Sequence, residues 1–166
     1  MSSPIANGAI VTFTNLGSRT CIDLAGGNSG NGVAISGWKC HGGSNQKWQL
    51  QQVGKTGPWP VYMIKNQYSG TYMDLYLGGT ADGTPIYGWQ GSNTAGSGNP
   101  HQRWRFVTGD PQNGNVVLIE NIGAGTYVDL YLGGVANGTG INGWSLAGDL
   151  SSGNPHQQWT VTVTQS

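Results

Sequence analysis

The chain has 166 residues, enough for one domain with a substantial core; 8% of them are charged, and the formal net charge is zero. This balance argues against a basic nucleic-acid surface and against binding to anionic membranes. Thirty glycines accompany seven tryptophans and seven tyrosines, a composition that is typical of a turn-rich all-β domain and excludes a disordered linker.

We expect no export signal in the N-terminal segment MSSPIANGAIVTF. It has neither a basic stretch nor an apolar run of signal-peptide length. No part of the chain approaches the roughly 18 consecutive apolar residues of a membrane-spanning helix. We therefore expect a cytoplasmic protein that does not insert into membranes.

One segment recurs three times along the chain. Each copy closes on a Gln-x-Trp motif, and the closing residues Trp48, Trp104 and Trp159 lie 56 and 55 residues apart. A fixed period of this size indicates a repeat architecture. The copies span approximately residues 9–53, 61–108 and 116–163.

Each copy predicts four short strands and no helix, because apolar and β-branched residues alternate and turn residues separate them. The first strands are expected at Ala9–Asn15, Val61–Asn66 and Val116–Asn121. The second strands are centred on Cys21–Leu24, Tyr72–Leu75 and Tyr127–Leu130. After a Gly-rich loop, the third strands are expected at Val33–Trp38, Pro85–Trp89 and Gly140–Trp144. The fourth strands are expected at Lys47–Gln51, Arg103–Val107 and Gln158–Val163.

Twelve strands in three equivalent units predict an all-β fold, a β-trefoil that occupies residues 1–166 as one domain. In this fold a six-stranded barrel is capped by three hairpins, with the Gln-x-Trp tryptophans near the core. A three-bladed propeller has the same number of strands, but propellers typically have four or more blades.

The spacing of residues in the first copy resembles the ricin B-type lectin domain, and all three copies fit. The residues that carry the resemblance are Cys21, Asp23, Trp38, Cys40, Asn45, Gln46 and Trp48. As a short, single-domain chain, this protein is similar to the mushroom cytoplasmic lectins of this family. The resemblance implies a non-catalytic, defensive lectin. It would bind galactose and N-acetylgalactosamine-type glycans of glycoproteins or glycolipids, including β-galactosides and LacdiNAc.

The two cysteines, Cys21 and Cys40, both lie in the first copy. Two buried reduced thiols would suit a cytosolic protein, whereas a disulfide would close the loop between them. In the family that the chain resembles, plant members carry a disulfide at these places, and both alternatives remain open. The other copies have Tyr72 and Tyr127 in place of Cys21, so the fold does not generally need the bridge.

Sugar binding requires a flat aromatic face for the C–H patch of the ring and short polar groups for its hydroxyls. In the first copy we expect Asp23 to accept from adjacent hydroxyls, Asn45 to donate its amide, and Trp38 to stack on the ring. The backbone at Gly26 and Gly27 can come close, because no side chain intervenes. His41 and Gln46 are candidates for the pocket wall. The predicted carbohydrate site therefore comprises Asp23, Gly26, Gly27, Trp38, His41, Asn45 and Gln46.

Repetition offers a structural alternative for several of these residues. Asp23 recurs in both other copies and could cap a shared turn, and Trp38 recurs and could be hydrophobic filling. Gln46 recurs in every Gln-x-Trp motif, which favours a structural role. His41 has no counterpart, which favours a plain loop residue. Asn45 is replaced by histidine in both other copies and is harder to explain by the fold alone.

The first copy also differs around its predicted pocket. After the aspartate it has Ala25-Gly26-Gly27, where the other copies have Tyr-Leu-Gly. The distance from the aspartate to the closing tryptophan is 25 residues, against 30 in the others. The second and third copies thus have bulkier side chains, a longer loop and histidine in place of Asn45. These differences indicate that the second and third pockets are closed or rebuilt. We therefore expect one galactose-type site per chain, so that agglutination would require a homodimer or a larger oligomer, unless the second and third sites bind another ligand.

The chain has too few suitable acidic residues to predict an enzyme. Glu120 is the single glutamate, and three of the six aspartates are repeat positions, so no glycosidase carboxylate pair stands out. Neither a Ser/His/Asp arrangement nor a metal-type cluster appears. We expect no catalysis, cofactor or metal. The alternative function is a β-trefoil protease inhibitor that acts through the long loops Gln90–Pro100 and Ser145–Pro155.

Overall fold

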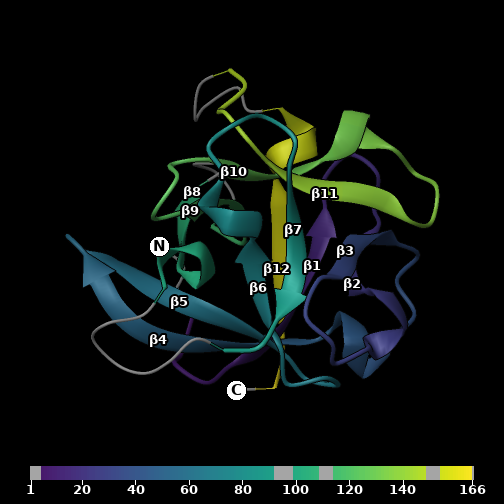
Figure 1. Cartoon of the computed structure of the whole chain (residues 1–166), viewed down its shortest axis with the longest axis horizontal. Coiled ribbons are helices and arrows are strands. Elements are labelled where there is room, and N and C mark those ends of the chain that lie inside the picture. The colour runs from purple at the N-terminus through teal and green to yellow at the C-terminus, as the bar shows by residue number, and fades with distance from the viewer. Residues whose placement is uncertain (1–4, 92–98, 109–113, 149–153, 166) are drawn as a thin grey trace.

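Strands and short 3-10 turns make up the regular structure of the described residues. The computed structural model describes residues 5–91, 99–108, 114–148 and 154–165 (Figure 1). The strands are β1 (Ile10–Asn15), β2 (Cys21–Leu24), β3 (Val33–Trp38), β4 (Trp48–Thr56), β5 (Trp59–Asn66), β6 (Tyr72–Leu75), β7 (Thr84–Trp89), β8 (Trp104–Thr108), β9 (Val116–Asn121), β10 (Tyr127–Leu130), β11 (Thr139–Trp144) and β12 (Trp159–Gln165). The 3-10 turns are η1 (Ala25–Gly27), η2 (Ser44–Gln46), η3 (Tyr76–Gly78), η4 (Pro100–Gln102), η5 (Tyr131–Gly133) and η6 (Pro155–Gln157).

The first and fourth strands of each copy form a closed barrel. Around the ring, β1 pairs with β4, β4 with β5, β5 with β8, β8 with β9, β9 with β12, and β12 with β1, all antiparallel. The second and third strands form three hairpins, and their strands β3, β7 and β11 pair with one another in a triangle. A six-stranded barrel with a triangular cap is a β-trefoil, so the predicted fold is confirmed and the propeller is excluded.

The three Gln-x-Trp tryptophans lie in the core, as predicted. Trp48, Trp104 and Trp159 are each 0% exposed. Each indole nitrogen donates to a backbone carbonyl at the second strand of its own copy: Ile22, Met73 and Val128, at 3.1, 3.1 and 3.0 Å. A buried N–H without a partner would be costly, so this bond allows the largest side chain to occupy the interior. It also ties the end of each copy to its hairpin.

The copies are joined to one another by a repeated hydrogen bond. A side-chain oxygen in the loop of each hairpin accepts the backbone N–H that follows the third strand of the next copy, at 2.7 Å each time. The pairs are Asn31 with Gln90, Asp82 with Ser145, and Asn137 with Lys39. The backbone just after Trp38 in the first copy is therefore held by the third copy.

The predicted strands agree with the structure except at their ends. The largest difference is the hairpin of β4 and β5, which runs on to Thr56 and back from Trp59 and extends beyond the barrel (Figure 1). The Gly57-Pro58 turn lets these residues pair with each other, and Arg105 of β8 donates to the Thr56 hydroxyl at 3.4 Å. The 3-10 turns were not predicted, because three-residue helices have no periodic pattern.

Cys21 and Cys40 form a disulfide, with their Cα atoms 5.2 Å apart. The alternative of two reduced thiols, which rested on the expected cytoplasmic location, is therefore wrong for this structure. Cys21 is buried at the start of β2, whereas Cys40 is exposed beside the predicted site. Within the described ranges, no helix is long and apolar enough to cross a membrane.

Candidate functional site

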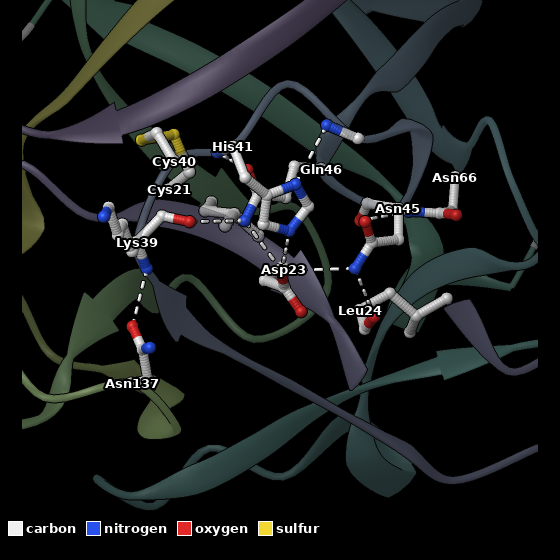
Figure 2. A network of polar contacts seen from close by, with 12 residues as sticks. Cys21, Asp23, Leu24, Lys39, Cys40, His41, Asn45, Gln46, Asn66 and Asn137 are labelled. Atoms are coloured by element: carbon white, nitrogen blue, oxygen red, sulfur yellow. Dashed lines mark hydrogen bonds and ion pairs between the residues drawn. A yellow bond between two sulfur atoms is a disulfide. The ribbon is translucent and has the colours of Figure 1, made fainter. Parts of the chain in front are cut away.

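Asp23 is the centre of a polar network at the end of β2 (Figure 2). Asp23 is 3% exposed, and three side chains face one of its carboxylate oxygens. The Gln46 amide donates to Oδ2 at 2.8 Å and the Asn45 amide at 3.2 Å, while Nε2 of His41 lies 3.5 Å away. In Figure 2 the other oxygen, Oδ1, points away from these donors. The network fixes the carboxylate and leaves one oxygen to accept from a ligand.

Gln46 ties the Asp23 carboxylate to the backbone of the loop after β3. It is 1% exposed and also donates to the backbone carbonyl of Lys39 at 3.0 Å. Its Oε1 accepts the backbone N–H of His41 at 3.1 Å. Gln102 and Gln157 contact Asp74 and Asp129 in the same way in the other copies. Gln46 therefore has a structural role, the alternative that the sequence favoured.

A cavity of about 320 Å³ lies beside the network. Its lining consists of Asp23, Ala25, Gly26, Trp38, His41 and Asn45. Trp38 is 39% exposed at the end of β3, so its ring is not hydrophobic filling. The sequence-predicted residues Asp23, Trp38 and Asn45 thus surround one cavity, which combines an exposed aromatic face with a fixed carboxylate.

The Asn45 side chain lies at the site, but the predicted direction of its hydrogen bonds is wrong. Its amide nitrogen donates to Asp23 and, at 3.1 Å, to the backbone carbonyl of Leu24. Both amide hydrogens are therefore used inside the protein. The carbonyl oxygen of the side chain remains, so Asn45 offers an acceptor to a ligand rather than the predicted donor.

His41 is part of the network rather than a plain loop residue. Its Nδ1 accepts the backbone N–H of Gly43 at 3.0 Å. A neutral imidazole then carries its hydrogen on Nε2, the nitrogen that faces Asp23. This tautomer turns an N–H toward the carboxylate, 3.5 Å from Oδ2.

The two glycines of η1 occupy different places. Gly26 lines the cavity beside Asp23, whereas Gly27 lines a neighbouring cavity of about 390 Å³. The second cavity is lined by Gly26, Gly27, Gly43, Ser44, Asn45 and Tyr68. Sequence reasoning missed Tyr68. A signal was present, because the position two residues after the Asn that ends the first strand is Tyr68 here but Gly17 and Gly123 in the other copies.

The other two aspartates, Asp74 and Asp129, are also buried, at 5% and 6% exposed. Burial raises the pKa of Asp74 and of Asp129 above the ordinary carboxyl value, and the glutamine and histidine beside each lower it only in part. In η3 and η5 the middle residues, Leu77 and Leu132, have positive φ of 53° and 52°. Gly26 takes this position in the first copy without the cost that a Cβ brings.

The third copy keeps a pocket, so the expectation that it is closed is wrong and the alternative, that it is rebuilt, holds there. This pocket has about 230 Å³ and a bulkier lining. It is formed by Asp129, Tyr131, Leu132, Trp144, Ala147, Asn154 and His156. The inhibitor alternative depends on the loops Gln90–Pro100 and Ser145–Pro155, of which residues 92–98 and 149–153 lie outside the described residues. Among described residues, no group of three or more His, Cys, Asp or Glu side chains could hold a metal ion.

Comparisons with known proteins agree with this architecture. Residues 3–89 and 100–166 match the family model "Ricin-type beta-trefoil lectin domain-like". The fold is similar to ThreeFoil, a designed 3-fold symmetric protein, with TM-score 0.78 and 21% identity over 92% of this chain and 97% of that one. The Rhizoctonia solani agglutinin has TM-score 0.75 and 26% identity over 97% and 99%. The Macrolepiota procera ricin B-like lectin, solved with lactose, has TM-score 0.72 and 25% identity over 97% and 99%. No curated protein sequence matches the chain.

Proposed function

Because the chain belongs to the ricin-type beta-trefoil lectin family, we propose that it binds terminal galactose and N-acetylgalactosamine residues of glycans through its first copy. The family is generally non-catalytic, and the proposed role of this chain is binding alone. The observation that carries the proposal is the pairing of Asp23 with Trp38 around one cavity.

The chemistry of this pair suits a pyranose ring. Oδ1 of Asp23 can accept from ring hydroxyls, and a charged acceptor makes the stronger kind of hydrogen bond. The exposed indole of Trp38 can cover the apolar C–H face of the same ring. The Macrolepiota procera lectin was solved with lactose, a β-galactoside, which supports a ligand of this class.

A glycan array tests the proposal. We expect wild-type protein to bind glycans that end in galactose or N-acetylgalactosamine, and Asp23→Ala to lose this binding. The matched variants Asp74→Ala and Asp129→Ala remove the equivalent carboxylates and should retain it. Retention of binding by Asp23→Ala, together with its loss in either matched variant, would refute the assignment to the first copy.

The proposal includes a homodimer as the agglutinating form. One monosaccharide site typically binds with sub-millimolar affinity, about −5 to −6 kcal/mol, which is too weak to cross-link cells alone. Two sites on one particle raise the avidity. A defensive role through cross-linked glycans would depend on this state. Light scattering should therefore give twice the mass of the 17.4-kDa chain, and a monomer that still agglutinates cells would contradict the one-site account.

A further inference from the structure

Tyr68 is an exposed aromatic residue that breaks the threefold repeat. It follows β5 in the turn Asn66-Gln67-Tyr68, and its side chain is 67% exposed. The other copies have Gly17 and Gly123 at the equivalent place. A large exposed ring at a position where the fold accepts glycine is not required by the scaffold.

The neighbouring loops explain why only the first copy has room for this ring. A Cβ on Gly17 would lie 3.2 Å from the Cβ of Pro155, and one on Gly123 would lie 2.8 Å from that of Pro100. The first copy has Ser44 at the position of these prolines. The shorter loop and Ser44 therefore open the space into which Tyr68 projects.

Histidines fill the corresponding space in the other copies. A Cβ on Gly78 would lie 2.5 Å from Nε2 of His101, and a Cβ on Gly133 would lie 2.5 Å from Nε2 of His156. In the first copy the equivalent glycine, Gly27, instead meets Tyr68, whose Cδ1 would lie 2.5 Å from an added Cβ. Two departures of the first copy, Ser44 and Asn45, thus meet Tyr68, a departure at the start of the second copy.

Tyr68 is held in this position by the end of β5. Oδ1 of Asn66 accepts the backbone N–H of Tyr68 at 3.0 Å. The amide of Asn66 donates to the backbone carbonyl of Asn45 at 2.9 Å, a contact visible in Figure 2. Asn66 is fully buried and links the aromatic residue to the turn that carries Asn45. The backbone of Tyr68 is therefore held beside the Asp23 network, and its ring lies against Gly27.

The cavity bordered by Tyr68 adjoins the cavity of Asp23. The two cavities, of about 390 and 320 Å³, share Gly26 and Asn45 in their linings. Each is within the size range of small-molecule sites. A ligand bound against Asp23 and Trp38 can thus extend past Gly26 toward Tyr68.

We infer that Tyr68, with Ser44 and Asn45, forms a second subsite for the sugar residue that is linked to the terminal galactose-type residue. The inference rests on the proposed function, because the first sugar must occupy the Asp23 cavity. The Tyr68 ring offers an apolar face to the second pyranose, and the Ser44 hydroxyl and the Asn45 side-chain oxygen offer hydrogen bonds to its hydroxyls. The site centred on Asp23 then binds a disaccharide more tightly than a lone monosaccharide.

Calorimetric titration with methyl β-galactoside and with N-acetyllactosamine tests this subsite. We expect wild-type protein to bind the disaccharide more tightly than the monosaccharide. Tyr68→Ala should weaken binding of the disaccharide roughly three- to tenfold, in keeping with the loss of one aromatic contact, and leave binding of methyl β-galactoside unchanged. Tyr68→Phe keeps the ring and should bind the disaccharide nearly as well as wild type.

A control variant and the monosaccharide separate the possible failures. Trp59→Ala removes an exposed aromatic residue on the β4–β5 hairpin and should change neither affinity. Unchanged disaccharide affinity in Tyr68→Ala, or an equal loss for both ligands, would overturn the subsite while the Asp23 site stands. Absence of binding of either ligand to wild-type protein would overturn the proposed function itself.

Discussion

Replacement of Gln46 by alanine should weaken both the fold and the galactoside site, and the structure gives the size of the first effect. The variant loses hydrogen bonds to Asp23, to the Lys39 carbonyl and from the His41 N–H. A bond to a charged group contributes about 1.5–3 kcal/mol and a neutral one about 1 kcal/mol. Gln46→Ala should therefore lower the free energy of unfolding by roughly 3–5 kcal/mol.

The third copy supplies the matched control for this variant. Gln157 bonds to Asp129, donates to the Ser145 carbonyl at 2.9 Å and accepts the Ala147 N–H at 3.1 Å, so it makes the same three contacts. Gln157→Ala should cost a similar free energy. Because a kcal/mol corresponds to about 2–4 °C in a chain of this size, both variants should melt roughly 6–20 °C below wild type.

The two variants should differ in galactoside binding, measured by calorimetry below their melting temperatures. Gln46→Ala removes the shortest hydrogen bond to the Asp23 carboxylate. The carboxylate is then no longer held in the orientation that binds the sugar, so the galactoside affinity of this variant should fall about tenfold or more. Gln157→Ala should bind like wild type. An equal loss in both variants would refute the placement of the site in the first copy, and a stability loss below about 1 kcal/mol would refute the hydrogen-bond account.

Three further predictions concern the ring, the buried carboxylates and the disulfide. Trp38→Ala should abolish measurable lactose binding in calorimetry, whereas Trp38→Phe should retain part of it; full affinity in Trp38→Ala would exclude stacking. Burial raises the pKa of Asp74 above the ordinary 3.8, so the folded state binds this proton more tightly than the unfolded chain. Asp74→Asn should therefore stabilise the protein in urea unfolding at pH 7, with an advantage that fades as the pH falls toward 3.8; an advantage independent of pH would contradict this. Cys40→Ser opens a loop with a sequence separation of 19 residues and should cost about 3 kcal/mol in urea unfolding without reductant, and nothing relative to wild type with reductant.

Much of the fold could be predicted from the period of the chain, because each Gln-x-Trp tryptophan needs the same buried place and the same carbonyl partner. The residues that line the Asp23 cavity could also be predicted, because Asp23 and Trp38 have the same separation as their counterparts in the other copies and Asn45 directly precedes the Gln-x-Trp motif. The hydrogen-bond direction of Asn45 could not, since it depends on where the η1 turn puts the Leu24 carbonyl.

Tyr68 escaped prediction for a related reason. Its contact with Gly27 joins residues about forty positions apart, and it depends on the absence of a proline at Ser44. A pattern within one copy does not show such a contact, because Tyr68 belongs to the start of the next copy. The sequence does show tyrosine at a position where the other two copies have glycine. Only the fold shows that this position faces Ser44, where the other two copies have proline.

The most direct test of the central claim is a calorimetric titration of lactose into three variants, Asp23→Asn, Asp74→Asn and Asp129→Asn. Each keeps the shape of the side chain and an acceptor for its glutamine, and removes only the charge. The account predicts that Asp23→Asn loses measurable binding, while the other two bind with wild-type affinity and a stoichiometry of about one per chain. Wild-type binding by Asp23→Asn, with loss in Asp129→Asn, would contradict it and move the galactoside site to the third copy.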